Sequence, residues 1–88
     1  MNVKKEIFTF INRSKDGLNN LCGKNIARFR MESGYSQREL ADKMQLVGLD
    51  LDKNAIQRIE CGKRFVTDIE LAAFAQHFEK SIEELIFP

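Results

Sequence analysis

Three short stretches of the sequence place a serine or threonine three residues before a glutamate. They run from Ser36 to Glu39, from Thr67 to Glu70 and from Ser81 to Glu84. In a capping box, the hydroxyl oxygen accepts a hydrogen bond from the third helical N–H, and the glutamate accepts one from the N–H of the capping residue. Apolar residues follow each of the three, so the spacing predicts three helix starts.

Two further segments carry apolar residues at helical spacing and end at a glycine. The first, residues 24–33, precedes Gly34, and the second, residues 52–61, precedes Gly62. Glycine ends a helix readily because it takes the left-handed conformation without a Cβ penalty. The expected helices are 24–33, 36–44, 52–61, 67–78 and 81–86. No segment shows sustained strand alternation, so the expected fold class is all-α.

The first twenty-two residues are less regular than the rest. An apolar cluster covers residues 7–11, and Lys15, Asp16 and Gly17 have the composition of a turn. A short helix packed on the bundle or on a second chain, a strand and a mobile arm all fit so short a run. We therefore divide the chain into an N-terminal extension, residues 1–22, and a helical domain, residues 23–88.

The composition argues against several classes of protein. No apolar run approaches the roughly 20 residues of a membrane span. The first residues make a poor signal peptide, which predicts a cytoplasmic protein. Cys22, Cys61 and a single histidine, His77, fall short of the about four clustered ligands of a zinc site. In the cytoplasm, both cysteines are expected to be reduced.

No catalytic motif is present in the sequence. Nothing resembles a hydrolase triad, a phosphate-binding loop or a pair of catalytic carboxylates. We expect a protein that is not an enzyme and that needs no metal, cofactor or small-molecule substrate.

Charge is distributed unevenly along the chain. The net charge of +1 divides into +2 for residues 1–23, +3 for residues 24–64 and −4 for residues 65–88. A basic middle and an acidic tail would let one face of the molecule meet phosphates while another stays away from them.

The expected helix 52–61 presents long polar side chains opposite its apolar side. Lysine and arginine can reach the O6 and N7 atoms of guanine, and asparagine and glutamine can pair with adenine. These side chains are Lys53, Asn54, Gln57 and Arg58. A solvated face is the ordinary alternative, but no glutamate occurs on this face before Glu60, and basic residues follow the helix.

Three motifs together resemble those of the Cro/cI-type helix-turn-helix family, the lambda-repressor-like domains. They are GYSQRELADKM at 34–44, NAIQRIECGKR at 54–64 and SIEEL at 81–85. The resemblance covers about residues 23–87. It implies a five-helix bundle that binds double-stranded DNA and places its third helix in the major groove.

The resemblance also implies roles for individual residues. Those that would read bases are Lys53, Asn54, Gln57 and Arg58. Those that would contact phosphates are Ser36, Gln37, Lys63 and Arg64. Arg30 and Glu60 would form a structural ion pair, and an arginine on the core-facing side of its helix does need such a partner.

One segment departs from the family pattern. The second and third helices are expected to be joined by residues 45–51, about five residues more than is usual in the family. Leu46, Val47, Leu49 and Leu51 are too apolar for a freely solvated loop. We expect some of them to reach the core, with Gly48 making the bend; an added surface for a partner is the alternative.

The expected function is transcriptional regulation, with repression of a prophage, mobile-element or toxin–antitoxin type. A homodimer is expected because one short helix reads few base pairs. Its contacts would come from residues 85–87 or from the N-terminal apolar cluster. The alternative is a protein-interaction module, or an antitoxin-like partner protein, with the same fold.

Overall fold

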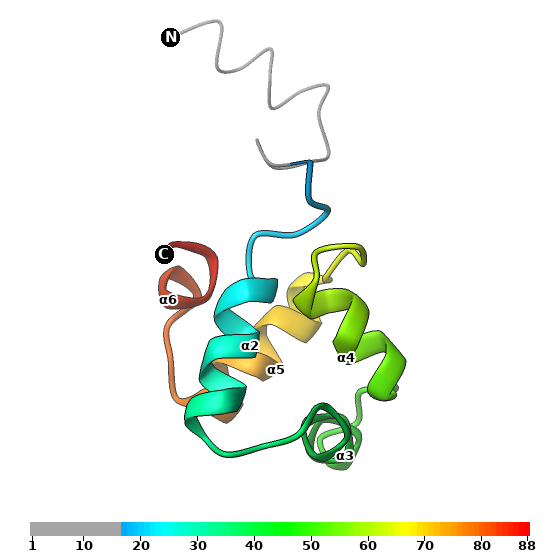
Figure 1. Ribbon diagram of the computed structural model, residues 1–88. Coiled ribbons are helices and arrows are strands. Elements are labelled where there is room, and N and C mark those ends of the chain that lie inside the picture. Colours follow the sequence, from blue (N-terminus) through cyan, green and yellow to red (C-terminus); the bar gives the residue numbers. More distant parts are fainter. Residues whose placement is uncertain (1–16) are drawn as a thin grey trace, which may run out of the picture.

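The computed structural model describes residues 17–88, and every regular element in that range is a helix. In chain order the helices are α2 (Gly23–Glu32), α3 (Gln37–Leu46), α4 (Lys53–Glu60), α5 (Asp68–Phe78) and α6 (Ile82–Ile86). Figure 1 shows α4 and α6 at opposite edges of the bundle, with α2 and α5 between them. The predicted all-α class is confirmed. The interpretations of residues 1–16 lie outside the described residues.

The three predicted capping boxes are all formed. At the start of α3, the Ser36 hydroxyl accepts the Glu39 N–H at 3.0 Å, and the Glu39 carboxylate accepts the Ser36 N–H at 2.8 Å. The same reciprocal pair begins α5 at Thr67 and α6 at Ser81. Each box satisfies two backbone donors that the start of a helix leaves without a partner.

Four of the described helices also end alike. After α3, the N–H of Leu49 donates to the Met44 carbonyl and that of Gly48 to the Gln45 carbonyl, both at 3.0 Å. This pattern is the Schellman motif, which needs a left-handed residue just past the helix. Gly48 provides it with φ +92°. The equivalent bonds close α2, α4 and α5.

The prediction for residues 45–51 was wrong about where α3 ends. The helix continues through Gln45 to Leu46, because the left-handed residue that stops it is Gly48 and a Schellman motif places that residue two positions after the last helical one. The connection to α4 is therefore residues 47–52. Its apolar residues divide: Leu51 is fully buried and Leu49 packs on the core, whereas Leu46 is 87% exposed and Val47 62%.

One core joins the helices. Its fully buried side chains come from α2 to α6 and from the α3–α4 connection: Ile26, Leu40, Met44, Leu51, Ile56, Ile59, Phe74 and Leu85. Asn25 is the one buried polar residue of the described chain, and its amide donates to the carbonyls of Leu85 at 2.7 Å and Phe87 at 3.0 Å. These bonds attach the C-terminal α6 to α2. The core thereby fixes α4 with its Ile56 and Ile59 side inward.

Glu79 supplies a test of how these helices end. It follows α5 with φ +55°, the left-handed conformation that the other three endings give to glycine. A non-glycine residue pays about 1–2 kcal/mol there. Glu79→Gly should therefore raise the free energy of unfolding by about 0.5–1 kcal/mol, or the Tm by about 4–8 °C per kcal/mol. Glu32→Gly, which removes the same charge from the last turn of α2, should instead lower it; a loss of stability in both variants would contradict the assignment.

Candidate nucleic-acid interface

The outer face of α4 carries the four residues predicted to read bases. Lys53, Asn54, Gln57 and Arg58 are all exposed, and no hydrogen bond or ion pair joins their side chains to any described residue. Their spacing of four residues puts Lys53 beside Gln57, and Asn54 beside Arg58, on one surface of the helix. The structure thus brings together four long polar side chains that are free to bind a ligand.

Asp52 defines the end of α4 that leads into this face. Its carboxylate accepts the Ala55 N–H at 2.8 Å, so the helix begins sharply at Lys53. The preceding connection is held by Gln45, whose amide donates to the Leu51 carbonyl at 2.9 Å. The first turn of α4 therefore has a fixed position relative to α3, despite the longer connection.

Arg30 and Glu60 lie in direct contact and link three helices. Arg30 Nε donates to Glu60 Oε2 at 2.6 Å, and a second guanidinium nitrogen donates to Oε1 at 3.1 Å. The third nitrogen donates to the Tyr35 carbonyl, and Gln37 Nε2 donates to Glu60 Oε1 at 3.0 Å. The two charged side chains are only 13% and 7% exposed. The network holds the end of α4 against α2 and against the start of α3.

Two of the residues predicted to contact phosphates sit at the start of α3. Ser36 is the exposed cap, and its hydroxyl oxygen already accepts a hydrogen bond while its proton can still be donated. Gln37 uses one amide proton on Glu60 and keeps the other. Both residues therefore retain a donor, next to the N-terminus of a helix, where anions are stabilised.

The other two predicted phosphate contacts, Lys63 and Arg64, differ in their surroundings. Lys63 is exposed. Arg64 forms a bidentate ion pair with Glu70, at 2.8 and 3.1 Å, and its side chain is 27% exposed. These hydrogen bonds are the main cause that holds the pKa of Glu70 below its usual range. Of these two cations, Lys63 is therefore the one that forms no ion pair with a described carboxylate.

Sequence reasoning missed two asparagines just before α2. It assigned them to an N-terminal extension, but Asn19 and Asn20 bind the backbone of the segment that follows α4. In Figure 1 these two parts of the chain meet at the same end of the bundle. The only signal for this contact was a pair of turn-forming residues before a helix, which gives no hint of a partner 44 residues away.

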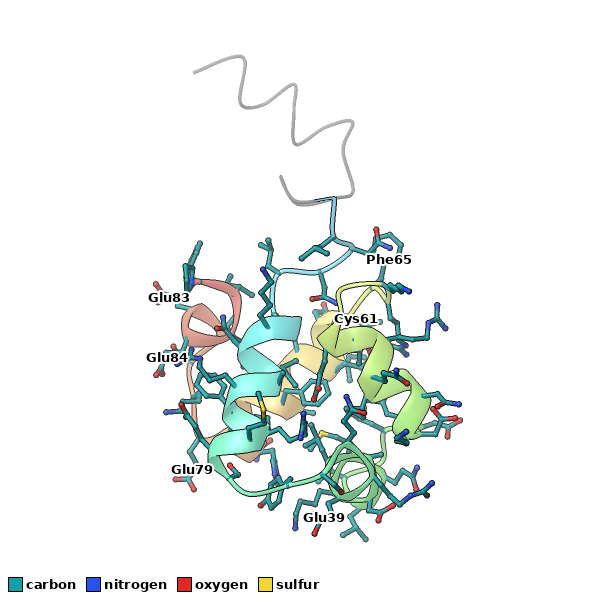
Figure 2. The ribbon with its side chains drawn as sticks, viewed as in Figure 1. Glu39, Cys61, Phe65, Glu79, Glu83 and Glu84 are labelled. Carbon is teal, nitrogen blue, oxygen red and sulfur yellow. The ribbon has the colours of Figure 1, made fainter. Side chains whose placement is uncertain are left out.

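Three glutamates of the C-terminal segment lie away from α4. Figure 2 shows Glu79, Glu83 and Glu84 along the edge formed by the end of α5 and by α6, opposite the edge formed by α4. Three of the five acidic residues of segment 65–88 are therefore far from α4, whereas Glu70 pairs with Arg64 just after it. A polyanion that approached α4 would meet the exposed Lys53 and Arg58 at a distance from this acidic edge.

Within residues 17–88, no group of three or more histidine, cysteine, aspartate or glutamate side chains could hold a metal ion. Burial raises the pKa of the Cys22 thiol to about 11, so that thiol is protonated at neutral pH. None of the helices in the described range is long and apolar enough to cross a membrane.

Comparison with known families identifies the fold. A family model described as helix-turn-helix, of the Cro/cI type, matches residues 26–85. The chain belongs to this helix-turn-helix family. A protein of this family is a DNA-binding regulator. No match was found among the curated proteins or among the solved structures.

Acid should destabilise this helix-turn-helix domain through its capping carboxylates. The pKa values of Glu70, Glu39 and Glu84 are lowered, the first mainly by Arg64 and the others mainly by backbone hydrogen bonds at Ser36 and Ser81. A lowered pKa favours the folded state above the unfolded pKa of about 4.3, and that contribution is lost as the pH falls through the folded pKa. Urea unfolding should therefore show stability falling from pH 5 to pH 3.

Glu70→Gln isolates the contribution of the carboxylate that pairs with Arg64. The variant should lose about 1 kcal/mol at pH 7 and show a shallower decline towards pH 3. Glu83→Gln is the matched control, because the Glu83 side chain makes no hydrogen bond or ion pair with the described residues. An unchanged pH profile in Glu70→Gln would show that the Arg64 pair contributes nothing to stability.

Proposed function

We propose that this protein is a sequence-specific regulator that represses transcription by binding double-stranded DNA with α4 in the major groove. The observation that carries the proposal is the outer face of α4, where Lys53, Asn54, Gln57 and Arg58 have no partner in the described chain. Arginine and lysine suit guanine, and asparagine and glutamine suit adenine. An exposed helix fits into the major groove, and these side chains can form hydrogen bonds with the base edges there.

Phosphate contacts would set the position of α4 on the duplex. We assign them to Ser36 and Gln37 at the start of α3 and to Lys63 and Arg64 after α4. The donors that Ser36 and Gln37 retain support this assignment, as does the exposed charge of Lys63. Arg64 would add less, because Glu70 already takes up two of its donors. Such contacts fix register and carry no sequence information.

We further propose that the protein acts as a homodimer in the cytoplasm, on an operator with two-fold symmetry. A single eight-residue helix reads few base pairs, and two copies double the number. Residues 85–87 are one candidate for the contact, since Phe87 is 57% exposed beside the buried Leu85. A small regulator of this kind fits a prophage, a mobile element or a toxin–antitoxin locus.

The exposed pair Leu46 and Val47 supports a second candidate function. It forms an apolar edge between α3 and α4 that could receive a protein partner, as in an antitoxin-like protein. Salt dependence separates the two functions. DNA binding weakens steeply with salt, with a slope near −0.9 per phosphate contact, whereas binding through an apolar edge does not.

Selection of bound sequences from a random DNA pool tests the proposal most directly. The full chain should enrich an inverted repeat whose half-sites are centred about 10 base pairs apart, or a multiple of that distance. The spacing of the half-sites would show how the two subunits are arranged, and the sequence of each half-site would show which bases α4 reads. Recovery of no shared sequence, together with salt-independent retention, would favour the partner-protein function instead.

Protein variants, assayed on the selected DNA site, test the roles of individual residues. Asn54→Ala and Arg58→Ala should each relax the base preference at one position and cost about 1–3 kcal/mol of binding free energy. Lys63→Ala should weaken selected and random duplexes alike. Gln76→Ala and Lys80→Ala, on and just after α5, are the controls for the loss of an amide and of a charge. Unchanged binding by both Asn54→Ala and Arg58→Ala would show that the outer face of α4 does not read the bases.

A further inference from the structure

We propose that Asn19 and Asn20 are positioning residues for DNA binding, which hold the segment after α4 so that Lys63 faces the phosphate backbone. This inference rests on the proposed function, because it takes Lys63 as a phosphate contact. It concerns residues that lie before the region of family similarity, which begins at residue 26. We call residues 62–64 the post-α4 loop.

The two asparagines bind every backbone carbonyl of the post-α4 loop. The Asn19 backbone N–H donates to the Gly62 carbonyl at 2.8 Å, and its side-chain amide donates to the Lys63 carbonyl at 2.9 Å. The side-chain amide of Asn20 donates to the Arg64 carbonyl at 2.8 Å. Each carbonyl of the loop therefore accepts a hydrogen bond from one of the two asparagines, and a change of backbone conformation would break these bonds.

The opposite edge of the post-α4 loop is bound by α4 itself. The Gly62 N–H donates to the Ile59 carbonyl, and the N–H groups of Lys63 and Arg64 both donate to the Arg58 carbonyl. All six backbone N–H and C=O groups of these three residues are thus hydrogen-bonded, three on each edge. With the backbone held from both sides, the Lys63 side chain is the part of that residue that remains free to move.

Asn20 also fixes the post-α4 loop to the rest of the domain. Its second amide proton goes to the Ile59 carbonyl at 3.0 Å, and its oxygen accepts the Gly23 N–H at 2.7 Å, at the start of α2. At Gly23 a Cβ would lie only 2.1 Å from the Ile59 oxygen, so α2 meets the backbone of α4 directly. Asn20 therefore joins α2, α4 and the loop in one rigid block.

Only an amide provides this set of bonds. Asparagine offers two donated protons and one acceptor, which here meet two carbonyls and one N–H. Aspartate has nearly the same shape but donates no proton when ionised, and its charge would face both carbonyls. Asn20→Asp should keep the bond from Gly23 and lose both bonds to carbonyl oxygens. This single substitution should therefore free the Arg64 carbonyl of the post-α4 loop while changing the size of the side chain very little.

The first experiment measures how DNA binding by Asn20→Asp depends on salt. On the selected duplex and on a random one, affinity should fall by about tenfold at 0.1 M salt. The negative slope of log K against log salt should become shallower by about 0.9, the value of one phosphate contact. The ratio of the two affinities should not change, since α4 still reads the bases. Gln76→Glu makes the same change of charge on the exposed side of α5 and should keep the wild-type slope.

The second experiment asks whether Asn20 acts through Lys63. In a double-mutant cycle, Lys63→Ala should cost about tenfold in the wild-type background and less than about twofold once Asn20→Ala is present. Asn19→Ala, which loses only the bond to the Lys63 carbonyl, gives the same test with less disturbance if Asn20→Ala unfolds. Additive losses, or an unchanged salt slope in Asn20→Asp, would overturn the inference.

The outcomes also separate this inference from the proposed function. If the wild-type protein binds DNA with a salt-dependent affinity and the Asn20 variants keep the wild-type slope, the positioning role is wrong and the proposed function stands. If the wild-type protein shows no salt-dependent DNA binding, the proposed function fails and the positioning role fails with it.

Discussion

The ion pair between Arg30 and Glu60 is the interaction on which the arrangement of the domain most depends. Both charges are largely withdrawn from water, and each is satisfied by further hydrogen bonds, from Gln37 and to the Tyr35 carbonyl. Removing one partner of such a pair typically costs about 3–5 kcal/mol, because the other charge is left buried. The pair is therefore worth less as a source of net stability than as a constraint on geometry. It allows one relative placement of α2, α3 and α4, and so one direction for the outer face of α4.

Hydrogen bonds to the backbone carry that constraint outward from the ion pair. Glu60, the last residue of α4, is held by Arg30. The carbonyls of residues 62–64 are held by the two asparagines, and the Arg64 side chain is held by Glu70. Glu70 is at the same time the capping carboxylate of α5. A continuous series of bonds thus runs from α2, through the end of α4, to the start of α5. Arg30 and Arg64 form ion pairs that fix this structure. Lys53, Arg58 and Lys63 form no ion pair with a described residue and stay available for a ligand.

Sequence reasoning succeeded where the physics is local. Capping boxes involve residues three apart, and the three that the sequence predicts are formed. It failed at the end of α3, because Gly48 was taken as a bend in a loop and not as the residue that closes a helix. It also divided the apolar residues of that connection incompletely: only the structure separates the buried Leu51 from the exposed Leu46. The roles assigned to individual residues at the DNA interface remain predictions.

The sequence by itself determined the helices, their capped starts, the all-α class and the polar face of α4, since each follows from residues within a turn or two of one another. Only the tertiary structure decided which polar residues are already occupied. Lys63 and Arg64 are neighbours in the sequence, but Glu70 takes one of them and leaves the other exposed. Asn19 and Asn20 resemble any turn residues until the fold brings the end of α4 against them. A hydrogen bond acts over about 3 Å whatever the separation along the chain, so local patterns could not foresee these contacts.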